Sequence, residues 1–248
     1  MDELFVRQSG QKRPERPFLL TSDVKASTER ERCLLRCRRI RAPSGSRNGR
    51  SVTVVCVPDA DDVARNLSPR EQLLSTASRV FYEEGINAIG VERVLSEAGV
   101  TRSTLYRYFD GKMGLVEAYL RREDEVIRGY FSAAAMEATS PRHLMELLIT
   151  GIADDASRYH RRGCPFINAA AEFPESAGPV RKIVSSHRDW FRNALEVALV
   201  DMGLADADSR ARTLVLLRDA ALVGGYLDGV EHVRRTFLAA ARREATLD

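Results

Sequence analysis

Residues 91–109 read VERVLSEAGVTRSTLYRYF, and this stretch predicts two helices joined by a tight turn. Val91, Val94 and Leu95 recur at the spacing of one buried helical stripe, with polar residues between them. Gly99 follows directly and suits the left-handed conformation in which many helices end. The stretch therefore predicts a helix-turn-helix.

The second helix of this pair is predicted to begin after Thr101, whose hydroxyl would cap it by accepting a backbone N–H. Leu105 and Phe109 lie four residues apart and are predicted to point inward. The opposite, exposed face carries polar and aromatic side chains, namely Arg102, Ser103, Tyr106 and Arg107.

Two cations stand at helix starts, where the helix dipole disfavours positive charge. Arg102 lies in the first turn after Thr101, and Lys112 follows Asp110 and Gly111, where the next helix is predicted to begin. Phosphate would reverse both penalties, because backbone N–H groups and the dipole favour anions. The pattern predicts contact with a DNA backbone; the alternative is a basic face that contacts only solvent.

A third helix is predicted upstream from a capping box at its start. Ser68 would cap it, Pro69 would take its first position and Glu71 would complete the box, with the helix ending near residues 84–85. Its predicted buried face consists of Leu73, Leu74, Ala77, Val80 and Phe81.

From about Leu67 to Leu120 the chain resembles the TetR family of bacterial transcriptional regulators. The residues that carry the resemblance are Phe81, Gly85, Ala98-Gly99-Val100, Thr104-Leu105-Tyr106, Tyr108-Phe109, Lys112 and Leu115. The resemblance implies an all-α fold, with a three-helix DNA-binding domain at 67–114 and a helical ligand-binding and dimerisation domain at 115–248. It further implies a homodimeric repressor that binds a palindromic double-stranded DNA operator and is released by a small-molecule effector.

The same resemblance assigns DNA contacts by position. Arg102 and Ser103 fall where the family contacts base edges, and Arg107 could contact bases or phosphates. Phosphate contacts are expected from Thr101, Thr104, Tyr106, Tyr108 and Lys112. Two glycines depart from the family pattern: Gly90 removes a hydroxyl cap from the middle helix, and Gly114 is expected to weaken the first turn of the helix that follows Lys112.

Composition agrees with a soluble, cytoplasmic protein. The 248 residues are 44% hydrophobic, with no apolar run of ~18 residues and no signal-peptide pattern. The four cysteines form no CxxC pair and the four histidines lack ligand spacing, so we expect reduced thiols and neither a metal nor a cofactor. GxSxG, GxGxxG, P-loop and HExxH motifs are missing, which argues against an enzyme.

Residues 1–66 differ from the rest, with 14 Lys and Arg against 9 Asp and Glu; the remaining residues carry 24 against 26. Four prolines interrupt this segment, and we expect it to be mostly disordered. One interpretation is a basic arm that adds DNA affinity. The other is a start codon assigned too far upstream, with the native protein beginning near Val57 or Val63.

The C-terminal half is predicted to contain a helix from Lys112 to about Glu137 and another from Pro141. A short helix within 163–174 and three more helices, over 179–203, 209–227 and 229–246, complete it. The long helix is expected to bury Leu115, Val116, Tyr119, Leu120, Val126 and Ile127, and the Pro141 helix Leu144, Leu147, Leu148, Ile152 and Ala156. Small residues at 220–221 and 224–225 would let the last two helices form a dimer interface; an intramolecular core is the alternative.

An effector pocket is expected among aromatic and polar side chains of these helices, although each residue taken alone is more typical of plain core. The candidates are Tyr159, Cys164, Phe166, Asn168, Phe173, His187, Trp190 and Tyr226. Cys164 follows three basic residues and could sense oxidants, or it could be a buried structural thiol. A DNA-binding protein that senses no ligand also remains open.

Overall fold

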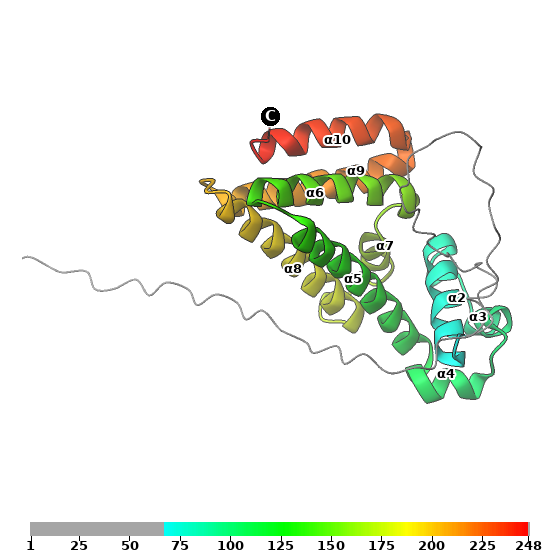
Figure 1. Ribbon diagram of the computed structural model, residues 1–248. Helices are drawn as coiled ribbons and strands as arrows, with labels where there is room; N and C mark the ends of the chain where they lie inside the picture. Colours follow the sequence, from blue (N-terminus) through cyan, green and yellow to red (C-terminus); the bar gives the residue numbers. More distant parts are fainter. Residues whose placement is uncertain (1–66, 248) are drawn as a thin grey trace, which may run out of the picture. The chain divides into compact units, whose positions relative to one another are not determined.

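The computed structural model describes residues 67–247, and every regular element in that range is helical, as predicted (Figure 1). The expectations for residues 1–66 lie outside this range. No helix between residues 67 and 247 combines the length and apolar composition needed to cross a membrane. The elements are α2 (Pro69–Glu84), α3 (Val91–Ala98), α4 (Arg102–Phe109), α5 (Gly111–Glu137), α6 (Pro141–Asp154), the π-helical turn η1 (Asp155–Tyr159), α7 (Pro165–Glu172), α8 (Pro179–Asp201), α9 (Ala207–Asp228) and α10 (Val230–Glu244).

The first three helices form the predicted unit. At the start of α2 the Ser68 hydroxyl accepts a hydrogen bond from Glu71 N (3.3 Å), and the Glu71 carboxylate accepts one from Ser68 N (3.1 Å). This reciprocal pair confirms the capping box. The three helices bury one apolar set against each other: Leu73, Leu74, Ala77, Val80, Phe81, Val94, Leu95, Leu105 and Phe109.

Two glycines fix the turns that follow α3 and α4. Gly99 adopts φ 65° and ψ 29°, the left-handed conformation predicted for it. Gly114 has a different role from the one expected, because a Cβ at this position would overlap the backbone carbonyl of Phe109. The absence of a side chain therefore allows the end of α4 to pack against the first turn of α5, and Gly114 is required rather than a weak point.

The buried face of α5 changes along its length, which corrects one prediction. In the first half Tyr119 meets Phe81 of α2, with ring centroids 6.1 Å apart. In the second half Phe131 packs against Trp190 and Phe191 of α8, with centroids 5.2 Å from each. Because the neighbours differ, Val126 is 43% exposed and not on the inner side as expected, whereas Ile127 is buried.

The predicted stripe of α6 was also partly wrong. Leu148 and Ile152 are buried as expected, but Leu144 and Leu147 are only half buried. Because α6 packs against α5, α8, α9 and α10, its buried surface is wider than one stripe. Its buried residues are Met145, Leu148, Ile149, Ile152 and Ala153. Ala156 is buried as expected, but it lies in η1, a π-helical turn that the sequence did not predict.

The last three helices pack side by side, with α10 against α6 and α9 (Figure 1). The small residues of α9 serve this packing within the chain. A Cβ at Gly224 would lie 3.4 Å from the Val233 side chain of α10, and one at Gly225 would lie 3.7 Å from the Ala156 carbonyl. Both glycines therefore face neighbours inside the protomer, at distances where a Cβ would make ordinary van der Waals contact.

Candidate functional site

The outer face of α4 presents the residues that the sequence predicted. Arg102, Ser103, Tyr106, Arg107 and Tyr108 are exposed, and Thr104 is half buried. The aromatic rings are notable for their exposure, 61% for Tyr106 and 44% for Tyr108. On the inner face Leu105 and Phe109 are buried and anchor the helix. The result is a rigid helix with a polar and aromatic surface open to a ligand.

The N-termini of α4 and α5 lack side-chain caps, which corrects one prediction. Thr101 occupies the N-cap position of α4, but its hydroxyl bonds to the hydroxyls of Ser103 (2.8 Å) and Thr104 (3.1 Å) instead of a backbone N–H. Asp110 precedes α5 in a left-handed conformation (φ 53°), and its side chain does not cap that helix. Orphan N–H groups at both helix starts can therefore bind an anion such as phosphate.

The three cations of this face differ in their surroundings. Arg102 forms an ion pair with Glu92, which lies in the first turn of α3 and which the sequence analysis missed. Partial burial lowers the pKa of Lys112, and the negative charge of Glu172 opposes this effect. Within residues 67–247 no carboxylate forms an ion pair with Arg107 or Lys112. Both are therefore available to phosphates, whereas Arg102 must leave Glu92 to reach a base.

Comparison with known proteins identifies the family. Residues 73–119 match the tetR family of bacterial regulatory proteins, and residues 141–228 match the tetracyclin repressor-like C-terminal domain. The chain is 39% identical to SCO4454, a TetR-family transcriptional regulator from Streptomyces coelicolor. That structural match has a TM-score of 0.69 and covers 72% of this chain and 94% of SCO4454. The chain belongs to the TetR family.

Curated TetR-type relatives differ in the sign of their regulation. BepR, a transcriptional repressor from Brucella suis biovar 1, is 27% identical over 68% of this chain and 83% of its own length. FasR, a transcriptional activator from Mycolicibacterium smegmatis, is 39% identical over 24% of this chain and 28% of its own length. TetR proteins are DNA-binding transcriptional regulators, so the helix-turn-helix of this chain is α3–α4.

Hydrogen bonds of Glu172 and Tyr82 join this helix-turn-helix unit to α7 and the loop before it, and the sequence analysis missed them. The Glu172 carboxylate at the end of α7 accepts hydrogen bonds from the backbone N–H groups of Ile86 (2.9 Å) and Asn87 (2.6 Å), in the turn between α2 and α3. The Tyr82 hydroxyl donates to the Gly163 carbonyl (3.0 Å) and accepts from Arg162 N (2.7 Å). No local pattern predicts contacts between residues about 80 positions apart.

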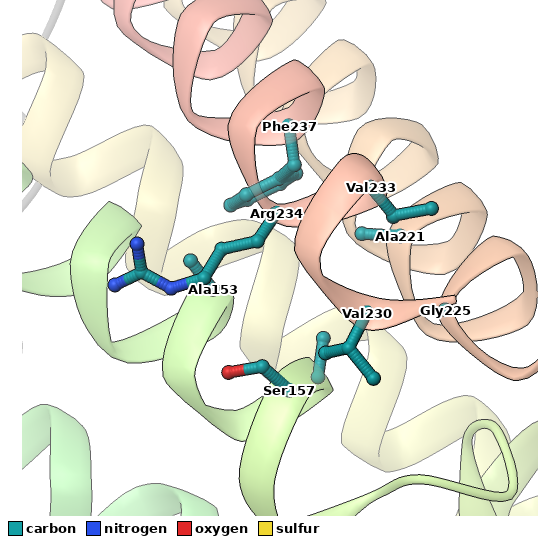
Figure 2. Close-up of a pocket in the computed structure, with 9 residues that line it drawn as sticks. Ala153, Ser157, Ala221, Gly225, Val230, Val233, Arg234 and Phe237 are labelled. Atoms are coloured by element: carbon teal, nitrogen blue, oxygen red, sulfur yellow. The ribbon is translucent and has the colours of Figure 1, made fainter. Parts of the chain in front are cut away.

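Two pockets lie in the C-terminal half. The smaller, of about 200 Å³, is at the junction of α6, η1, α9 and α10, and Figure 2 shows its side chains. The cation on its wall, Arg234, is paired with Asp154 at 2.7 Å. The larger, of about 420 Å³, opens to solvent between α5 and α6 and reaches Phe191 of α8 and Arg218 of α9.

None of the predicted effector residues lines the larger pocket. The rings of Phe166 and His187 are buried and stack at 3.8 Å, and Trp190, half buried, lies over the guanidinium of Arg128 at 4.1 Å. Asn168 and Phe173 are half buried, and Asn168 donates to the Arg162 carbonyl. Tyr159 is 62% exposed and Tyr226 is 57% exposed. Their roles in ligand binding stay predictions.

Cys164 is fully buried at the N-cap of α7, where its sulfur accepts a hydrogen bond from Arg218 Nη1 (3.4 Å). Redox-sensing thiols are typically accessible, so this burial favours the structural alternative.

Two buried histidines differ in charge. Burial lowers the pKa of His187 to about 4, although Asp124 accepts a hydrogen bond from its Nδ1 (2.7 Å) and partly opposes that effect. Burial also disfavours protonation of His160, but hydrogen bonds to Asp155 and Glu123 outweigh it and raise the pKa of His160 to about 9. At neutral pH His187 is therefore neutral, and His160 is positively charged.

Proposed function

We propose that this chain is a one-component transcriptional repressor that binds a palindromic operator as a homodimer and is released by a small-molecule effector. The observation that carries the proposal is the outer face of α4, with exposed Arg102, Ser103, Tyr106 and Arg107 above two uncapped helix N-termini. Base edges are read by such side chains, and phosphates fit such N-termini. The relation to BepR supports repression.

Two domains are part of this proposal, a DNA-binding domain over 67–114 and a regulatory domain over 115–248. Glu172 and Tyr82 connect them. An effector acts by binding better to the conformation whose two recognition helices are wrongly spaced for successive major grooves ~34 Å apart. We expect a conformational change in the regulatory domain to reach the helix-turn-helix through the hydrogen bonds that Glu172 accepts from Ile86 and Asn87.

The homodimer is proposed to form through α8 and α9. Leu216, Val223 and Leu227 make an exposed apolar row on α9, and Val197 and Val200 are exposed on α8. By contrast, the exposed positions of α10 include no large apolar residue. We therefore propose α8 and α9 as the interface in place of the last two helices, which the sequence predicted. Sedimentation equilibrium of Leu216→Lys should show monomers, and Arg243→Glu on the exposed face of α10 should remain dimeric.

Selection of bound duplexes from a random DNA pool tests the function as a whole. We expect a palindromic site to be enriched by the full chain, and enrichment to disappear in an Arg102→Ala, Arg107→Ala double variant. Circular dichroism would verify that the variant folds, because both side chains are exposed. Failure of the full chain to enrich any sequence at low ionic strength would refute the proposal.

A further inference from the structure

The larger pocket has an apolar wall and one charged end. Three aromatic and several aliphatic side chains form most of its surface, and its empty volume of about 420 Å³ includes space open to solvent. Its charged residues are Asp155 and Arg218. The complete lining consists of Ile127, Tyr130, Phe131, Ala134, Leu147, Leu148, Gly151, Ile152, Asp155, Phe191 and Arg218.

Arg218 is the unusual member of this lining because it is only 3% exposed and keeps unused donors. Its Nη1 atom donates to Cys164 Sγ (3.4 Å) and to Asp219 Oδ1 (3.1 Å). No acceptor within residues 67–247 hydrogen-bonds to its Nε or Nη2. Arg188 also binds Asp219, at 2.7 Å, so one carboxylate is shared between two guanidinium groups. A buried arginine with free donors in an apolar pocket favours an anionic partner.

The other charged residue of the pocket is already compensated. Asp155 Oδ1 accepts a hydrogen bond from His160 Nδ1 at 2.7 Å, and His160 carries a positive charge at neutral pH. Glu123 contacts the second nitrogen of the same ring at 3.4 Å. Asp155 is therefore engaged by His160. The guanidinium of Arg218 lies over the ring of Phe191 at 5.0 Å, but its Nε and Nη2 atoms hydrogen-bond to no acceptor within residues 67–247.

We propose that this pocket binds an amphipathic monocarboxylate, with an alkyl or aryl body against the apolar wall and the carboxylate on Nε and Nη2 of Arg218. The fork of an arginine matches the two oxygens of a carboxylate. This assignment rests on the proposed function, since it names the chemical class of the effector. It also places the anion on the side chain that contacts Cys164, which is the N-cap of α7. Helix α7 in turn contacts the helix-turn-helix unit through Glu172.

Calorimetric titration without DNA tests the proposal. The probes are decanoate and para-butylbenzoate, below their micelle concentrations, each compared with its primary amide. We expect at least one carboxylate to bind, with its amide about ten-fold weaker or more, because the amide lacks the charge that Arg218 recognises. Decylamine serves as the cationic probe for Asp155.

Two variants locate the site. Arg218→Gln should remove the preference for carboxylate over amide. Gly151→Leu should weaken every probe, because Gly151 lines the pocket and a Cβ there has no neighbour within 4 Å, which leaves room for the added side chain to occupy pocket space. Gly129→Leu, in equally open space on α5 and outside the lining, is the matched control and should bind as the native chain does. If Arg218→Gln does not fold, the comparison of Gly151→Leu with Gly129→Leu and the comparison of each carboxylate with its amide still test the proposal.

Several results would overturn the proposal: neither carboxylate binds, the amide binds as tightly as the acid, decylamine binds better than decanoate, or the two leucine variants behave alike. Because the titration contains no DNA, its failure leaves the assignment as a transcriptional regulator standing. Failure of the DNA selection would instead count against that assignment while carboxylate binding remained measurable.

Discussion

Glu172 offers the sharpest test of how the regulatory part of the chain holds the DNA-binding part. Each of its carboxylate oxygens accepts one backbone N–H, from Ile86 at 2.9 Å and from Asn87 at 2.6 Å. A hydrogen bond to a charged group stabilises by about 1.5–3 kcal/mol, and one between neutral groups by about 1 kcal/mol. In Glu172→Gln one oxygen becomes an NH2 group that faces an N–H donor, and the other loses its charge. We expect the turn to lose about 1–2 kcal/mol of local stability.

Amide hydrogen exchange measures this loss directly. At Ile86 and Asn87 the exchange rates should rise roughly 5–30-fold in Glu172→Gln, which is the stated free energy expressed as a ratio. Glu175→Gln is the matched control, because it removes the same charge from an exposed side chain just beyond α7. Unchanged exchange at both amides, or an equal change in the Glu175 variant, would refute the idea that Glu172 secures this turn.

Three further predictions concern charge. Lys112→Ala should weaken binding to all DNA sequences and flatten the slope of log K against log salt by about one unit in fluorescence anisotropy, because one phosphate contact is lost. Glu92→Gln should tighten DNA binding about two- to five-fold, since it releases Arg102 from an exposed ion pair that solvent screens; weaker binding would contradict this. His160 has a pKa of about 9 in the folded chain and 6.5 ordinarily, so its protonation contributes up to about 3 kcal/mol to the free energy of unfolding. That contribution is complete below pH 6.5 and is lost as the pH rises through 9. Urea unfolding of the native chain and His160→Gln should therefore converge at high pH, and parallel curves would exclude the effect.

Local sequence patterns predicted the helix-turn-helix unit well because its signals act over a few residues. The capping box needs only Ser68 and Glu71, three positions apart, and the left-handed turn needs only Gly99. The inward orientation of Leu105 and Phe109 follows from helical periodicity alone. Each of these features is decided before the helix meets distant parts of the chain.

The sequence predictions were wrong where residues far apart in the chain determine which side chains are buried. Val126 matches the apolar spacing of α5, yet it is exposed because the partner of that helix changes from α2 to α8. Gly114 looked like a weak helix position because the nearby Phe109 carbonyl cannot be seen in a local pattern. The effector prediction rested on residues such as Phe166, which do not line the cavity between α5 and α6, and their roles in ligand binding stay predictions.

Helix α7 explains how a small pocket could control a distant helix-turn-helix. It has eight residues and is therefore about 12 Å long, short enough to move as one body. Its N-cap, Cys164, contacts the guanidinium of Arg218, and its last residue, Glu172, holds the turn before α3. An anion on Nε and Nη2 of Arg218 adds a negative charge beside the guanidinium whose Nη1 donates to Cys164 and Asp219, so it changes the electrostatics at one end of α7. A ligand can shift the conformation only by such differential contacts. Removing the acceptor at the other end, as in Glu172→Gln, should therefore leave carboxylate binding intact while reducing its effect on DNA affinity. Loss of both together would mean that α7 does not transmit the signal.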